Sequence, residues 1–208
     1  MYTLYWSRGS ANMACHAAMI EIGAPFKLIE IDADKGEQKS AAYLAINPHG
    51  RVPTLIDDGR VMYESAAILL YLCEKHLEAG LMPAVGSPNR AHFLQWLFYL
   101  TNTVQEALMN WWHADNYLES ESERRSLVAN AERRLARMWQ LLDDVLAKNG
   151  PYLLGSEFSA VDMFLAMLGH WSRKMAKPAR SYPNIGRLMD LIEKRPAYSR
   201  MMAEEGNT

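Results

Sequence analysis

The sequence predicts an α/β unit followed by an all-α unit in a chain of 208 residues. Three observations carry this expectation. Strand-like and helix-like segments alternate as far as His76, a run rich in glycine and proline follows, and no strand-like segment occurs after Asn89. Half of the residues are hydrophobic and 22% are charged, which is ordinary for a folded protein.

The first part reads β-α-β-α-β-β-α along the chain. "YTLYW" and "PFKLIEID" are strand-like, and "SANMACHAAMIEIG" between them has helical spacing and ends at Gly23. "SAAYLAIN" predicts a short helix that stops at Asn47-Pro48. "TLIDDGRVMY" predicts a hairpin that turns at Asp58-Gly59, and "ESAAILLYLCEKHL" predicts a third helix. Because a strand–helix–strand unit normally gives parallel pairing, we expect a small mixed sheet flanked by helices.

The second part is predicted to be entirely helical. We expect a first domain at 1–77, a linker at 78–88 and a helical domain at 89–208, because glycines and prolines cluster between the two. The helical stretches are about 90–114, 121–148, 160–175, 185–194 and a last one from Ala197, with breaks at Gly150-Pro151, Pro178 and Pro183. Ser159 is the expected N-cap of the 160–175 helix, with Asp162 as the acid of a capping box.

Net charge, apolar runs and cysteine placement indicate which kinds of partner and which cellular compartment to expect. A net charge of −2 provides no basic field for nucleic acid or an anionic membrane. "MYTLYWSRGS" lacks the layout of a signal peptide, and no apolar run approaches the length of a membrane span. Cys15 and Cys73 lie far apart inside predicted helices, so neither a disulfide framework nor a metal site is expected. We expect a protein of the reducing cytoplasm.

Two unusual features stand close together in the first part. Val52-Pro53 precedes a predicted strand, although proline removes a donor from the ladder. Glu64-Ser65 opens an apolar helix, where backbone amides and polar groups face outward. Each feature alone also has a structural explanation, as an edge-strand proline and as a helix cap.

The order of these segments resembles the glutathione transferase family. The resemblance rests on "NPHGRVPTLIDDG" followed by "YESAAILLYL", and on "PYLLGSEFSAVDMFL" and "YPNIGRLMDLIEKRPAY" further along, so it covers essentially the whole chain. It implies a thioredoxin-like N-terminal domain and a helical-bundle C-terminal domain. It also implies a cytoplasmic homodimer that uses glutathione as co-substrate and adds it to a small hydrophobic electrophile.

The resemblance assigns the two unusual features to one ligand. Pro53 would follow a cis peptide bond, and the Val52 backbone would pair with the cysteinyl part of glutathione. Ser65 and its amide would bind the γ-glutamyl carboxylate at the helix start, and Glu64 would receive the ammonium. The glycine carboxylate needs cations, for which the candidates are Lys39, His49 and Arg51.

The sulfur of glutathione needs a donor, because the thiolate is the nucleophile and a free thiol has a pKa of about 8.5. The loop "WSRGSANMA" leads into the first helix. Ser10 is the first candidate, by resemblance to the serine-type members, and its alternative role is that of an N-cap. The cysteine of the bacterial beta-type members falls on Ala11 in this chain. Asn12 and Tyr5 are the other candidate donors.

The electrophile would meet an apolar wall made mainly by the second part. "LMNWWHADNY" concentrates aromatic and methionine side chains, which suit a pocket for varied small molecules. Core packing or a dimer interface explains them equally well. The candidate residues are Trp6, Met109, Trp112, His113 and Trp171.

Two other functions are compatible with the same scaffold. One is a glutathione-dependent disulfide reductase or peroxidase, which needs no C-x-x-C if two glutathiones bind together. The other is a non-enzymatic protein that binds glutathione or apolar ligands. Sequence alone does not separate these, because fold does not fix the chemistry of a pocket.

Overall fold

The computed structural model describes residues 1–206. The chain forms two compact units, one made of Met1–Met82 and the stretch that begins at Lys194, the other of Pro83–Glu193. The expected α/β and all-α organisation is confirmed, and the last helix belongs with the first unit. The domain limits at 77 and 89 stay predictions.

The first unit contains a four-stranded mixed sheet in the order β2-β1-β3-β4. Its strands are β1 (Tyr2–Trp6), β2 (Phe26–Glu30), β3 (Thr54–Asp57) and β4 (Arg60–Tyr63). The β1 and β2 strands pair in parallel, whereas β1 with β3 and β3 with β4 are antiparallel. Asp58 and Gly59 both have positive φ, at 46° and 80°, as the predicted hairpin turn requires.

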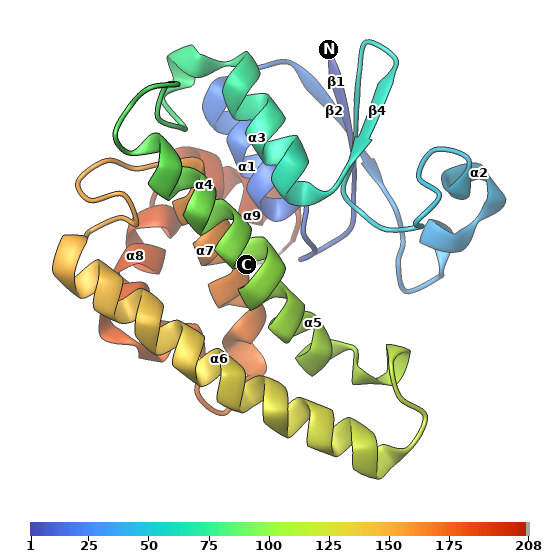
Figure 1. The fold of residues 1–208 in the computed structure, drawn as a ribbon. Coiled ribbons are helices and arrows are strands. Elements are labelled where there is room, and N and C mark those ends of the chain that lie inside the picture. The colour runs from blue at the N-terminus through green and yellow to red at the C-terminus, as the bar shows by residue number, and fades with distance from the viewer. Residues whose placement is uncertain (207–208) are drawn as a thin grey trace. The chain divides into compact units, whose positions relative to one another are not determined.

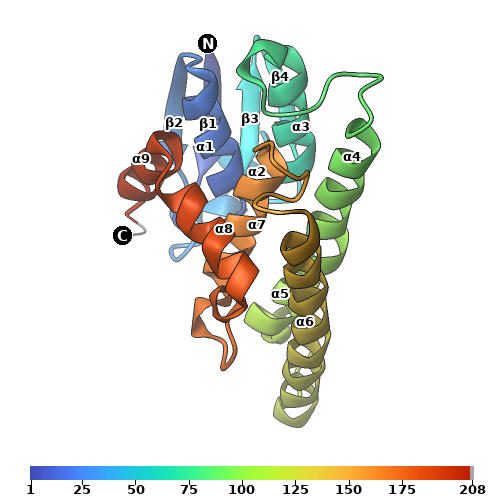
Figure 2. The same cartoon turned by 90° about the vertical axis from the view of Figure 1, so that its left-hand side faces the viewer.

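Four helices complete the first unit. The helices α1 (Met13–Ile22) and α3 (Ser65–Lys75) lie together on one side of the sheet, and α2 (Ala41–Leu44) lies on the other (Figure 1). The last helix, α9 (Pro196–Glu204), packs beside α1 (Figure 2). Every residue of α1 from Met13 to Met19 is buried, and the helix packs against both α3 and α9. Gly23 ends α1 at φ 74°, as predicted.

The second unit consists of helices. They are α4 (Arg90–Tyr99), α5 (Glu106–Trp112), α6 (Glu121–Asn149), α7 (Ala160–Trp171) and α8 (Pro183–Glu193). A π-helical stretch, Leu100–Gln105, joins α4 to α5, so the predicted single helix is locally widened. Nearly all of α7 is buried, and the capping box of Ser159 and Asp162 is confirmed. None of the helices within residues 1–206 is long and apolar enough to cross a membrane.

The structure moves the start of two predicted helices. The helix expected at 185–194 begins at Pro183, and the one expected from Ala197 begins at Pro196. A proline is favourable at this position because its missing N–H has no partner in the first turn and its fixed φ suits a helix.

Candidate active site

The start of α3 holds the most unusual backbone of the first unit. Glu64 has φ 73° and ψ 108°, a region that residues with side chains rarely adopt. Ser65 follows as the first residue of the helix and is buried, whereas the Glu64 side chain is exposed. The first N–H groups of a helix have no partner within it, and the helix dipole adds partial positive charge there. The N-terminal end of α3 is therefore arranged to accept an anion.

Two polar side chains form hydrogen bonds with the segment before β3. The Tyr43 hydroxyl and the Asn47 amide both donate to the Arg51 carbonyl, each at 2.8 Å. The same two side chains contact the Thr54 hydroxyl at 2.8 and 3.0 Å. The peptide bond between Val52 and Pro53 is cis, as expected. These contacts fix the backbone on both sides of Val52, and the sequence analysis did not identify Tyr43 or Asn47 as part of the site.

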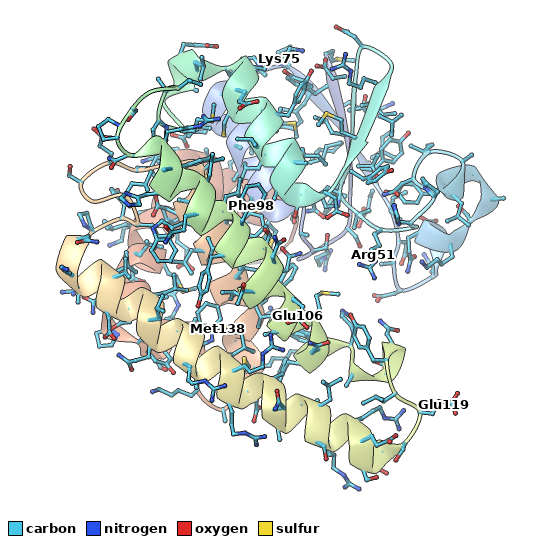
Figure 3. All side chains as sticks on the ribbon, in the orientation of Figure 1. Arg51, Lys75, Phe98, Glu106, Glu119 and Met138 are labelled. Atoms are coloured by element: carbon cyan, nitrogen blue, oxygen red, sulfur yellow. The ribbon has the colours of Figure 1, made fainter. Side chains whose placement is uncertain are left out.

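Two of the candidate cations, His49 and Arg51, lie on the loop between α2 and Val52, and Lys39 ends a short 3₁₀ helix, Glu37–Lys39, before α2. The Lys39 ammonium donates to the His49 carbonyl at 3.2 Å, and the His49 ring meets the Tyr63 ring edge-on with centroids 5.0 Å apart. Arg51 is exposed between α2 and β3 (Figure 3). Gly50 has φ 58°, and a Cβ there would lie 2.6 Å from the Gln38 carbonyl oxygen, so the turn requires glycine.

Asn12 makes the central hydrogen bonds of the loop that leads into α1, residues 6–12, which we call the sulfur loop because it holds the candidate donors Ser10 and Asn12 to the glutathione sulfur. Helix α1 begins at Met13, and Asn12 rather than Ser10 occupies the N-cap position, without capping the helix through its side chain. Instead, the Asn12 Oδ1 atom accepts hydrogen bonds from the Ser7 N–H at 3.0 Å and from the Ser10 hydroxyl. Asn12 is completely buried, whereas Ser10 is half-buried. Ser10 is thus the more accessible of the two candidate donors.

Tyr5 lies in the middle of β1 and is half-buried. Its ring lies beside that of Tyr43, with the centroids 5.6 Å apart and the planes tilted by 55°. It is therefore packed as a strand residue next to the group that holds Arg51. Tyr5 stays a candidate donor to the glutathione sulfur because it lies in the same unit as the sulfur loop.

The two cysteines of the chain are both buried. The Cys15 thiol lies 3.3 Å from the Ser65 carbonyl oxygen, to which it donates. Burial, assisted by the neighbouring Cys73 and Glu205, raises the pKa of the Cys15 thiol far above its ordinary value. A protonated thiol of this kind links α1 to the start of α3 and is a poor nucleophile.

The predicted electrophile residues divide between the two units. Trp6 ends β1 in the first unit and is largely buried, whereas the other candidates belong to the second unit. There the Trp112 indole N–H donates to the Trp171 carbonyl at 3.0 Å, which joins the end of α5 to the end of α7. Met109 is half-buried on α5, and His113 is exposed directly after it.

No group of three or more histidine, cysteine, aspartate or glutamate side chains suited to a metal ion occurs among residues 1–206. The N–H groups at the start of α3 and the cations Lys39 and Arg51 suit an anionic ligand.

Both parts of the chain match known domain families. Residues 1–74 match "Glutathione S-transferase, N-terminal domain", and residues 125–202 match "Glutathione S-transferase, C-terminal domain". The glutathione S-transferase GstA of Escherichia coli O157:H7 is 25% identical over 205 residues, which is 98% of each chain. The chain belongs to the glutathione S-transferase family.

Solved structures of this family agree with the fold. A glutathione transferase homolog from Sulfitobacter, crystallised with bound glutathione, has a TM-score of 0.90 and 28% identity over 98% of both chains. A glutathione transferase from Methylococcus capsulatus has a TM-score of 0.88 and 29% identity over the full length of both chains. The transferase thus has the expected thioredoxin-like domain and helical domain, and it is an enzyme.

Proposed function

We propose that this transferase activates the thiol of glutathione and adds the thiolate to small hydrophobic electrophiles. The observation that carries the proposal is the strained Glu64 at the start of α3. Glu64 lies in the same compact unit as Val52, whose neighbours Tyr43 and Asn47 hold by hydrogen bonds, and as the sulfur loop with Ser10. Backbone outliers that their surroundings maintain are concentrated at ligand sites. The Sulfitobacter relative, which was crystallised with glutathione, supports the same ligand.

Glutathione is held along its whole length in this proposal. The Val52 backbone, next to Pro53, pairs with the cysteinyl part as an added strand. The γ-glutamyl carboxylate accepts hydrogen bonds at Ser65 and benefits from the α3 dipole, while Glu64 binds the ammonium. The glycine carboxylate lies among the candidate cations Lys39, His49 and Arg51.

The sulfur is activated by Ser10 in this proposal. Lowering the thiol pKa by one unit takes 1.36 kcal/mol of preferential stabilisation of the anion, to which a hydroxyl donor and the α1 N-terminus both contribute. The Ser10 hydroxyl turns from Asn12 to the sulfur when glutathione binds. Because the Asn12 Oδ1 atom keeps the Ser7 N–H, no buried acceptor is left without a partner. Asn12 and Tyr5 are the alternative donors.

The second substrate and the assembly follow the family pattern. We propose that the electrophile contacts an apolar wall and that the enzyme is a cytoplasmic homodimer. Val61 and Tyr63, 40% and 38% exposed on the edge strand β4, provide apolar surface that a second copy would cover. The wall residues are Trp6, Met109, Trp112, His113 and Trp171.

The test is a pH titration of the ultraviolet absorbance of the bound glutathione thiolate. We expect a thiol pKa below the free value of about 8.5 in the wild type, and a rise towards that value in Ser10→Ala. Ser7→Ala is the matched control, since its hydroxyl takes part in none of the hydrogen bonds described. An unshifted thiol pKa under saturating glutathione would contradict the mechanism.

Product assays then separate the reaction classes. With an aryl halide, a mixed disulfide and a hydroperoxide offered in parallel, we expect turnover of the aryl halide to depend on Ser10. Turnover of the disulfide or the hydroperoxide alone would identify a redox enzyme. Tight glutathione binding without turnover of any of the three would identify a binding protein.

A further inference from the structure

The carboxyl end of α9 reaches the sulfur loop. Glu204 is the last residue of the helix and Glu205 follows it. Although both are charged residues near the end of the chain, Glu205 is completely buried, whereas the Glu204 side chain is 33% exposed. A buried carboxylate needs donors around it, and α1 supplies them.

Two side chains of the α1 region contact Glu205. The Asn12 Nδ2 atom donates to the Glu205 Oε1 atom at 2.8 Å. The His16 Nδ1 atom lies 2.9 Å from the same oxygen, and its Nε2 atom lies 3.0 Å from the Glu204 Oε2 atom. The His16 ring is completely buried and meets the Phe26 ring edge-on. The two glutamates therefore clamp the ring of His16, but only Glu205 touches Asn12.

The chemistry of the carboxylate fixes the orientation of the Asn12 amide. An ionised carboxylate accepts hydrogen bonds and donates none, so the amide nitrogen must face Glu205 and the amide oxygen must face the loop. That oxygen accepts from the Ser7 N–H and from the Ser10 hydroxyl. A continuous chain of hydrogen bonds thus leads from Glu205 through Asn12 to Ser10.

We propose that Glu205 is a positioning residue for Ser10, acting through the orientation of the Asn12 amide. The proposal rests on the proposed role of Ser10 as the donor to the glutathione sulfur. With the amide oxygen turned to the loop, it holds the Ser7 N–H, and with it the loop backbone that carries Ser10, also after the Ser10 hydroxyl has turned to the sulfur. With the amide reversed, an NH₂ group would face the Ser7 N–H, and the loop would lose its common acceptor.

Glu204 provides the control for effects of the two carboxylates that do not pass through the Asn12 amide. It contacts His16 like Glu205 and also accepts from the Arg200 guanidinium at 2.6 Å, but within residues 1–206 it makes no hydrogen bond or ion pair with the loop of residues 6–12. Both carboxylates contact the His16 ring, and of the two only Glu205 contacts the Asn12 amide.

The experiment compares Glu205→Gln with Glu204→Gln in the full-length enzyme. The glutamine keeps the shape of the side chain but no longer dictates which end of the Asn12 amide faces it. We expect Glu205→Gln to lower kcat/KM for an aryl halide at pH 6.5 by about tenfold and to shift the midpoint of the bound-thiolate titration upward by about one pH unit. In Glu204→Gln, kcat/KM should stay within about twofold of the wild type and the titration midpoint within about 0.3 pH unit.

The same comparison in a Ser10→Ala background tests whether the effect passes through the serine. A positioning role predicts that Glu205→Gln then has no further effect on the titration, because coupled residues are not additive. An equal effect in both backgrounds would overturn the proposal, as would a lower melting temperature with unchanged kinetics. If the glutamine variant does not fold, Glu205→Asp takes its place: it keeps the charge but withdraws the carboxylate from the Asn12 amide by one methylene, so the titration midpoint should again rise, and an unchanged midpoint and rate would overturn the proposal.

The outcomes also separate this inference from the proposed function. If Ser10→Ala leaves the titration and the rate unchanged, the assignment of the serine fails, and the positioning role fails with it. If Ser10→Ala has its expected effect and Glu205→Gln has none, the serine mechanism stands and only the positioning role is wrong.

Discussion

Replacing Asp162 by alanine removes a carboxylate that several donors share at the start of α7. The Asp162 Oδ2 atom accepts from the Ser159 N–H at 2.8 Å and from the Ser159 hydroxyl at 3.1 Å. Its Oδ1 atom accepts from the Leu153 N–H at 2.8 Å, which ties the preceding loop to the helix. Asp162 is completely buried, so water does not compete for these positions.

The structure gives a larger effect than the capping pattern alone. Loss of a helix cap costs roughly 0.5–2 kcal/mol. The variant also leaves the N–H groups of Leu153 and Ser159 without their acceptor, in residues that are only 3% and 2% exposed. A buried donor without a partner costs about 1–3 kcal/mol. We therefore expect Asp162→Ala to lower the free energy of unfolding by roughly 2–6 kcal/mol.

Urea unfolding followed by circular dichroism measures this loss, at one protein concentration because a dimer would make stability concentration-dependent. Asp162→Asn should lie between the wild type and alanine, since it keeps one acceptor. Asp144→Ala, at an exposed position of α6, is the control and should change stability by less than about 0.5 kcal/mol. A fully stable but inactive Asp162→Ala enzyme would refute the reasoning.

Two further predictions concern buried carboxylates. Burial raises the pKa of Asp57, but hydrogen bonds from Lys75 and Tyr71 outweigh burial and hold the pKa below its ordinary value. Such a group stabilises the fold above its unfolded pKa of about 3.9 and loses this effect as the pH falls through its folded pKa, so the melting temperatures of Asp57→Asn and wild type should converge below about pH 4. Asp143 of α6 accepts from the first amides of α8 at 2.7 and 3.0 Å. Asp143→Ala should lose about 1–3 kcal/mol for each amide in urea unfolding, and a loss under 0.5 kcal/mol would contradict this.

The sequence predicts the parts of the fold that local chemistry determines. The turn at Asp58-Gly59, the end of α1 at Gly23 and the capping box at Ser159 each follow from what a few neighbouring residues require. The π-helical stretch after Tyr99 was not predicted. There the Thr101 hydroxyl donates to the Leu97 carbonyl at 3.0 Å, so a side chain takes part in the hydrogen bonding of the backbone.

Contacts between distant residues carry no such local signal. Asn12 and Glu205 are 193 positions apart, and nothing in the periodicity of either segment relates them. Two consecutive glutamates at the end of a helix are typical of a solvent-exposed position. This expectation suits the partly exposed Glu204 but not the buried Glu205. For the same reason Asn47 is recognisable as a helix stop, but its bond to the Arg51 carbonyl is not.

The sulfur atoms of the chain itself bear on the choice between transfer and redox chemistry. A mixed disulfide between protein and glutathione requires an accessible thiolate, yet Cys15 and Cys73, the two cysteines of the chain, are both buried. A redox reaction on this scaffold would therefore join two glutathione molecules. In either reaction the attacking sulfur belongs to the ligand, and the groups that stabilise its anion serve both. The titration with Ser10→Ala consequently tests a step that the two reactions share, and only the products distinguish them.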